Sequence, residues 1–210
     1  MILYFIHVPR TGGNSVASWL NNNNDKFITK YDGHDRYSKQ NHDSLKKSDK
    51  TIAFTSLRDP VDLTVSFYAY IKIAALHRSY KEANSFSFSD WIVKSKEHKN
   101  FFTRFFNNLE WDKLINPPIE YINPSEIQAR ELVENAYQTL NNFDYILDTS
   151  SLTNDINNMC AKESINCKFN VHINSYPKPE ISKSDIEKIK EVCSLDYELL
   201  KKIQNIKIKY

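Results

Sequence analysis

The sequence predicts an α/β fold with a central parallel sheet and a helix-rich C-terminal half, and two patterns support this prediction. Residues 2–8 form a short apolar run and residues 51–57 (TIAFTSL) form a second run of the same buried type, both typical of strands buried on both faces of a parallel sheet. Each run is followed by a turn and then by apolar residues at helical spacing. Ligands of such folds bind beyond the carboxyl ends of the strands, so these two turns are the first places to look for function.

The first third of the chain predicts few regular elements. The apolar run 2–8 leads into a turn at 9–13, and apolar residues within 16–20 predict a short helix. The pattern allows a short strand at 27–30. Otherwise the region 25–50 is polar and charged, and nothing in it suggests that it contributes to a core.

The strand at 51–57 precedes the best-marked helix of the chain. Asp59 can cap this helix and Pro60 suits its first position, and the apolar stripe continues to about residue 77. Ser182 and Asp185 resemble a capping box at the start of the last helical region. The other predicted elements are helices at 88–95, 98–108, 125–141 and 151–163, and a strand at 143–147.

Length, charge and cysteine content bound the class of protein. A chain of 210 residues is the size of one domain, so we expect a single domain over 1–210. A net charge of +2 gives no general nucleic-acid-binding face. Three cysteines without a C-x-x-C pair indicate neither a disulfide framework nor a zinc site. The first apolar run is too short for a signal peptide or a membrane span, so we expect a cytoplasmic protein.

The first turn has the composition of an anion-binding loop. The chain has only three glycines, and two of them, Gly12 and Gly13, stand side by side in Pro9-Arg10-Thr11-Gly12-Gly13-Asn14-Ser15. Backbone N–H groups, two hydroxyls and a helix N-terminus come together there, and phosphate is their natural ligand. The loop lacks the spacing and the lysine of a Walker A motif, which disfavours a GTPase or an ordinary ATPase.

The second turn places an arginine at the end of the strand 51–57. Arg58 precedes Asp59-Pro60, and Ser66 lies eight residues beyond the arginine in the second turn of the predicted helix. A guanidinium fork with a hydroxyl suits a second phosphate.

Together the segments FIHVPRTGGNS and FTSLRDPVDLTVSFYAYI resemble the cofactor signatures of PAPS-dependent sulfotransferases of the carbohydrate type, where PAPS is 3′-phosphoadenosine 5′-phosphosulfate. That family has P-K-T-[AG]-[GS]-[TN]-S after its first strand, and R-D-P with a serine eight residues after the arginine. Arg10 departs from the pattern, because the family has lysine there. The resemblance implies a P-loop-like three-layer α/β/α fold and an enzyme that needs no metal.

The resemblance also implies roles for individual residues. The backbone of 11–15 would bind the 5′-phosphosulfate, with the side chains of Thr11 and Ser15, and Arg10 would stabilise the charge on the departing product, 3′-phosphoadenosine 5′-phosphate (PAP). Arg58 and Ser66 would bind the 3′-phosphate. The heparan sulfate 2-O-sulfotransferase branch and its bacterial relatives carry a Gly-His pair whose histidine is the proposed base, and Gly33-His34 matches it.

Alternatives remain open at several of these positions. Asp32, Asp35 and His42 lie in the same polar region as His34 and compete with it as the base. Arg104 matches a Thr-Arg pair of some bacterial relatives, but it is equally interpreted as a surface or salt-bridge residue. The acceptor would be a small molecule or a glycan. The alternative functions are a kinase-like nucleotide enzyme that needs Mg²⁺, and a non-catalytic member of the fold that binds a nucleotide or a partner protein.

Overall fold

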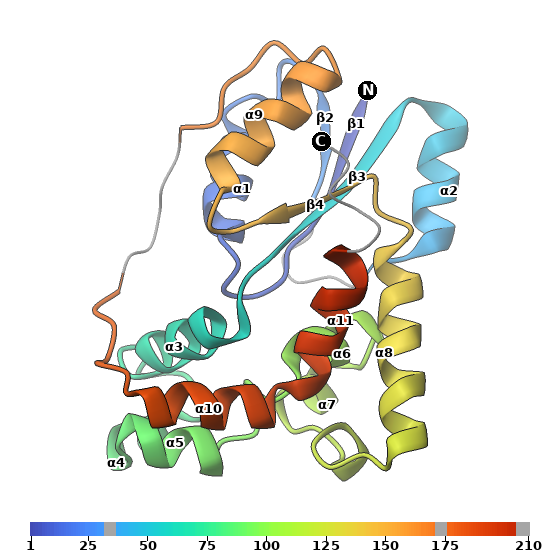
Figure 1. The fold of residues 1–210 in the computed structure, drawn as a ribbon. Coiled ribbons are helices and arrows are strands. Elements are labelled where there is room, and N and C mark those ends of the chain that lie inside the picture. Colours follow the sequence, from blue (N-terminus) through green and yellow to red (C-terminus); the bar gives the residue numbers. More distant parts are fainter. Residues whose placement is uncertain (32–36, 171–175, 205–210) are drawn as a thin grey trace. The chain divides into compact units, whose positions relative to one another are not determined.

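The computed structural model describes residues 1–31, 37–170 and 176–204 (Figure 1). The chain divides into two compact units. Unit 1 comprises Met1–Arg58, Gln138–Asn174 and Lys207–Tyr210, and unit 2 comprises Asp59–Tyr137 and Ser175–Ile206. Within the described residues the chain forms one all-parallel four-stranded sheet and eleven α-helices, so the predicted α/β class is confirmed. The single sulfotransferase domain over 1–210 stays a prediction.

The sheet belongs to unit 1, and its two central strands are those that the apolar runs predict. Strands β1 (Ile2–Ile6), β2 (Ile28–Lys30), β3 (Thr51–Leu57) and β4 (Tyr145–Asp148) lie in the order β2-β1-β3-β4. All three pairings are parallel. Every residue of β1 and β3 is buried, as is typical of the central strands of a parallel sheet.

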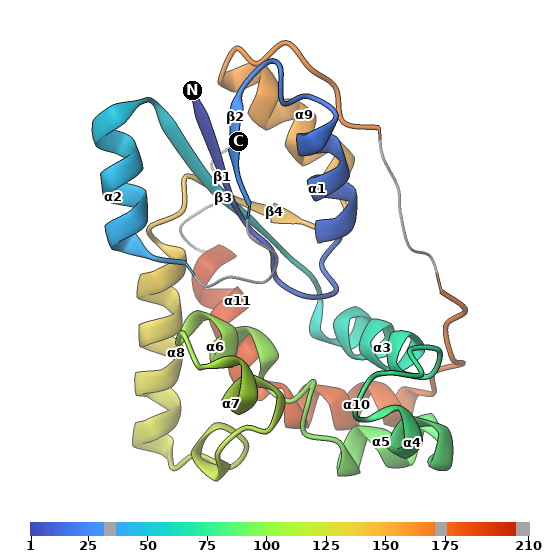
Figure 2. The ribbon, with the colours of Figure 1, turned by 180° about the vertical axis from the view of Figure 1, so that it is seen from behind.

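Helices cover both faces of this sheet (Figures 1 and 2). On one face α1 (Gly13–Asn21) and α9 (Leu152–Lys162) pack on alternate strand residues such as Leu3 and Phe5. On the other face Tyr4 meets Tyr37 and His42, which lie just before and within α2 (Lys39–Ser48). Unit 1 is therefore a three-layer α/β/α arrangement.

The prediction that 25–50 contributes nothing to a core is wrong. Phe27 belongs to the core cluster, and Tyr37 and His42 are both buried. Helix α2 escaped prediction because Leu45 is its only aliphatic residue, and its remaining side chains are polar or charged. Its buried contacts come from a histidine, which periodicity in apolar residues does not detect.

All the regular elements in the described part of unit 2 are helices. Its elements are α3 (Pro60–Ile71), α4 (Tyr80–Ser85), α5 (Phe88–Lys94), α6 (Phe101–Phe106), α7 (Trp111–Ile115), the 3-10 helix η1 (Ile119–Tyr121), α8 (Glu126–Leu140, whose last turn belongs to unit 1), α10 (Lys183–Val192) and α11 (Ser194–Gln204). Helix α3 ends at Ile71, earlier than predicted, and the apolar side chain of Leu76 beyond it is fully exposed.

The two predicted helix starts in unit 2 are confirmed. The carboxylate of Asp59 accepts hydrogen bonds from the N–H groups of Val61 (2.8 Å) and Asp62 (3.4 Å), and Pro60 occupies the first helical position of α3. At α10 the Ser182 and Asp185 side chains form a capping box.

Candidate anion-binding site

The two suspected turns lie at the carboxyl ends of neighbouring strands. Loop 9–15 follows β1, and Arg58 follows β3, which pairs with β1 over five residues. The other neighbour of β1 is β2, so the strands that follow β1 in the chain, β2 and β3, lie on opposite sides of it and the strand order reverses there. Open α/β sheets bind ligands at such a switch point.

Loop 9–15 turns through two residues of positive φ. Arg10 has φ 68°, and Gly12, the N-cap of α1, has φ 82°. A side chain is strained in this left-handed region, and a Cβ added at Gly12 would also lie 2.8 Å from Leu152 Cδ2. Gly12 therefore meets the expectation that these glycines serve a special backbone. Gly33 and its neighbour His34 lie outside the described residues.

The start of α1 has no side-chain cap among the described residues. The carbonyl oxygen of Gly12 accepts hydrogen bonds from Ser15 N (3.0 Å) and Val16 N (3.2 Å), which form the first turn. Within the described part of the chain no side chain caps this helix, and its first turn has no acidic residue. Because the first N–H groups of a helix carry its positive dipole end, this helix start favours an anion.

Buried hydroxyl groups hold loop 9–15 in place through hydrogen bonds to backbone carbonyl oxygens. Thr11 is fully buried, and its hydroxyl donates to the carbonyl oxygen of Val8 (2.8 Å). The Ser56 hydroxyl, from β3, donates to the carbonyl oxygen of Thr11 (2.8 Å) and lies 3.0 Å from Thr11 Oγ1. The Thr11 hydroxyl therefore supports the loop, and the role in 5′-phosphate binding that the resemblance gives this residue stays a prediction.

A third strand end contributes to the same brace. The Thr149 hydroxyl follows β4 and donates to the carbonyl oxygen of Leu57 (2.6 Å), and it lies 3.2 Å from the carbonyl oxygen of Thr11. Sequence reasoning did not assign a role to Ser56 or Thr149. The available signal was their place, a polar residue at or beside the carboxyl end of a buried strand.

The two turns also meet through their arginines. The Nη1 atom of Arg58 donates to the carbonyl oxygen of Arg10 (3.2 Å), and both residues are half-buried. The structure thus brings together Arg10, loop 11–15 and Arg58 within unit 1. Ser66 is buried in the second turn of α3 and belongs to unit 2.

The alternatives for a base are reduced by one. Asp32 and Asp35 lie outside the described residues, as His34 does. His42 is only 2% exposed, and its Nδ1 lies 2.8 Å from the hydroxyl of Tyr37. Burial lowers the pKa of His42, so this residue is a neutral packing group rather than an accessible base.

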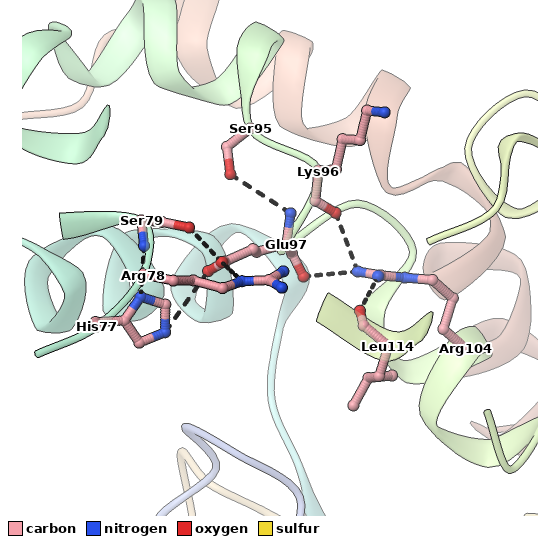
Figure 3. Close-up of polar contacts among 8 residues, drawn as sticks. All are labelled: His77, Arg78, Ser79, Ser95, Lys96, Glu97, Arg104 and Leu114. Carbon is pink, nitrogen blue, oxygen red and sulfur yellow. Dashed lines mark hydrogen bonds and ion pairs between the residues drawn. The ribbon is translucent and has the colours of Figure 1, made fainter. Parts of the chain in front are cut away.

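Of the two interpretations left open for Arg104, the one that makes it a surface residue is wrong. It is completely buried in unit 2, where its guanidinium donates to the carbonyl oxygens of Glu97 (2.6 Å), Lys96 (3.2 Å) and Leu114 (Figure 3). Burial lowers the pKa of Arg104 to about 10. Since its bonds fasten backbone to backbone, we assign Arg104 a structural role.

A buried carboxylate lies next to this arginine (Figure 3). The Glu97 side chain accepts hydrogen bonds from the Ser79 hydroxyl and from Nε of Arg78 (3.4 Å), and it lies 3.9 Å from Nε2 of His77. These contacts fasten the turn after α3 to the segment before α6. Arg104 contacts the backbone of Glu97, not its carboxylate.

Searches for related proteins give this site no family name. No family model matches the chain, and no curated protein matches its sequence.

Among residues 1–31, 37–170 and 176–204, His, Cys, Asp and Glu side chains form no group of three that could hold a metal ion. In the same ranges every helix is too short or too polar to cross a membrane.

Proposed function

We propose that this chain is a sulfotransferase that moves a sulfuryl group from PAPS to a hydroxyl of a carbohydrate. The observation that carries the proposal is the start of α1, where two glycines and an uncapped first turn lie at the carboxyl end of β1, with the Arg58 guanidinium bonded to the same loop. The two sequence motifs that resemble the sulfotransferase signatures fall on these two strand ends.

The residues present fit a phosphate group. A side chain at position 12 or 13 would collide with Leu152 or His7, so packing within unit 1 requires glycine at both positions. The first N–H groups of α1 and the Ser15 hydroxyl would bind the 5′-phosphate end, and Arg58 would bind the 3′-phosphate, a role that the resemblance also implies for Ser66. PAPS supplies the sulfuryl group when bound.

Catalysis in this proposal depends on position and charge. Sulfuryl transfer resembles phosphoryl transfer in requiring the attacking and leaving oxygens to be in line, with little covalent help from the protein. Arg10 stabilises the negative charge on the leaving oxygen, and His34 accepts the proton of the acceptor hydroxyl. Arginine retains the charge of the family lysine but presents a planar fork instead of a point charge.

Calorimetric titration with PAP, ADP and ATP, with and without Mg²⁺, tests the ligand. We expect micromolar PAP binding without metal, weaker ADP binding, and a loss of at least about a hundredfold for Arg58→Ala, because a desolvated phosphate would lose its charged partner. The matched control is Arg130→Ala, which removes an arginine whose side chain is 77% exposed in unit 2. Tighter, metal-dependent ATP binding would contradict the proposal and favour a kinase-like enzyme.

A second experiment separates binding from turnover. His34→Ala should leave PAP affinity nearly unchanged and reduce turnover at least about tenfold, since a general base acts only on the chemical step. Equal turnover in the two proteins would show that His34 is not the base. PAP binding by a wild type that transfers nothing to any hydroxyl acceptor would favour the non-catalytic alternative.

A further inference from the structure

One glycine of the loop is not explained by its backbone. Gly12 needs the conformation at φ 82°, but Gly13 does not lie in the positive-φ region. Instead, a Cβ added at Gly13 would lie 1.7 Å from Cδ2 and 1.9 Å from Nε2 of His7. The imidazole ring therefore fills the space in which any other side chain would start.

The His7 ring is held on its other side as well. It is 5% exposed, its Nδ1 lies 3.1 Å from the hydroxyl of Tyr31, and it stacks on Phe5 with ring centroids 5.9 Å apart. Tyr31 directly follows β2, and Gly13 is the first residue of α1. His7 thus lies between the end of one strand and the start of the helix that would bind the anion.

We propose that His7 is a positioning residue of this site, which acts through Gly13 and is itself oriented by Tyr31. Its ring fixes the place of the first residue of α1, and hence the direction of the first N–H groups of the helix. Small displacements of such donors reduce binding strongly, because the donors must match the ligand oxygens. The proposal rests on the proposed function only for the ligand, PAP.

A double-mutant cycle tests the contact, with PAP affinity measured by calorimetry for Gly13→Ala, His7→Ala and the double variant. Gly13→Ala alone should weaken binding at least about tenfold, because its methyl group and the ring cannot share one space. His7→Ala alone should weaken PAP binding about threefold, since Gly13 is then less restrained. The double variant should bind almost as well as His7→Ala. A double variant no better than Gly13→Ala overturns the proposal.

The matched control is Gly12→Ala, one residue earlier in the same loop. Its defect comes from the positive φ and from Leu152, so His7→Ala should not rescue it. Equal rescue of both alanine variants would show a general loosening of the loop and would contradict a specific contact.

Tyr31→Phe separates positioning from a purely structural role. It keeps the aromatic ring and removes the hydroxyl that orients His7, so PAP should bind about two- to threefold more weakly at a temperature where every variant is folded. A change in thermal unfolding alone, with unchanged affinity, overturns the positioning role. A wild type that does not bind PAP overturns the proposed function, and in that case thermal unfolding of the same cycle still reads the contact between His7 and Gly13.

Discussion

The N-termini of α1 and α6 present the same chemical problem and show opposite solutions. At α6 the carboxylate of Asp196, from α11, accepts hydrogen bonds from Phe102 N (3.1 Å), Thr103 N (2.8 Å) and the Thr103 hydroxyl (2.9 Å). At α1 the N-cap is Gly12, and no side chain in the described residues caps the helix. One helix start is closed by a carboxylate of the protein itself, and the other has no side-chain cap in the described part of the chain.

The closed helix start of α6 is part of a reciprocal arrangement with α11. Asn100, the N-cap of α6, accepts a hydrogen bond from Leu195 N (3.0 Å), so α6 and α11 each receive a cap from the other. Asp196 and Arg104 are both fully buried there. A carboxylate at one helix start therefore occupies the position that, in our proposal, a phosphate occupies at the other.

The largest effect should come from replacing Arg104, the buried arginine of α6. Arg104→Leu removes the donors of three backbone carbonyls, and we expect the free energy of unfolding to fall by about 3–5 kcal/mol. Urea unfolding measures this loss, and Arg130→Leu, at an exposed ion pair, should change stability little. PAP affinity should stay unchanged under all conditions in which the Arg104→Leu protein is folded. Weaker PAP binding would make Arg104 part of the site and undo the contrast.

The cap of α6 should also respond to pH with a defined sign. Burial raises the pKa of Asp196 to about 6, although its three donors oppose this shift. Between about pH 4 and 6 the folded protein keeps a proton that the unfolded chain has lost, so this group stabilises the fold at low pH and the stability is lost as the pH rises. The stability of wild type relative to Asp196→Asn should therefore increase by about 2–3 kcal/mol from pH 7 to pH 4.

Asp185 is the matched control for this titration, because it too caps a helix in unit 2. Burial opposes ionisation there, but the hydrogen bonds from Ser182 prevail and lower the pKa of Asp185. Its contribution to stability should be present above about pH 4 and be lost as the pH falls. The stability of wild type relative to Asp185→Asn should therefore decrease as the pH is lowered, opposite to that relative to Asp196→Asn. Two variants with the same sign would contradict the assigned pKa directions.

The sequence predicted the elements whose local signals agree with their burial. The run at β1 is continuously apolar, the run at β3 is of the same buried type, and the capping box at α10 is formed by side chains three residues apart. It could not predict α2, which is buried through His42, or the buried state of Arg104. Both depend on partners distant in sequence or on backbone carbonyls, and neither leaves an apolar period.

The candidate site shows the same division. The glycines of loop 9–15 and Arg58 could be picked out because rare residues follow buried strands. The contact between His7 and Gly13 depends on the fold of the turn that joins them. The hydrogen bonds of Ser56 and Thr149 come from strands that meet only in the folded sheet. Their roles follow from the strand order, which local sequence patterns do not show.

A smaller effect should separate support of the loop from support of the sheet. Thr11 and Thr55 are both fully buried, and their hydroxyls donate to the carbonyl oxygens of Val8 (2.8 Å) and Ile6 (2.9 Å). Each threonine-to-valine change should cost about 1–2 kcal/mol of stability, because a buried acceptor is left without its donor. Only Thr11→Val should also weaken PAP binding in calorimetry, because only Thr11 lies in loop 9–15. Equal affinities would show that the brace does not shape the site.

The smallest effect is the most direct test of the contrast, because it converts the open helix start toward the closed kind. Asn14 is exposed in the first turn of α1, and Asn14→Asp should stabilise the helix by about 0.3–1 kcal/mol through its dipole. The same carboxylate should weaken PAP binding by repulsion, and added salt should reduce both effects. Asn22→Asp, at the other end of α1, should destabilise the protein slightly and leave PAP affinity unchanged. A more stable Asn14→Asp protein that binds PAP as the wild type does would place the anion elsewhere, since one helix start cannot favour two anions at once.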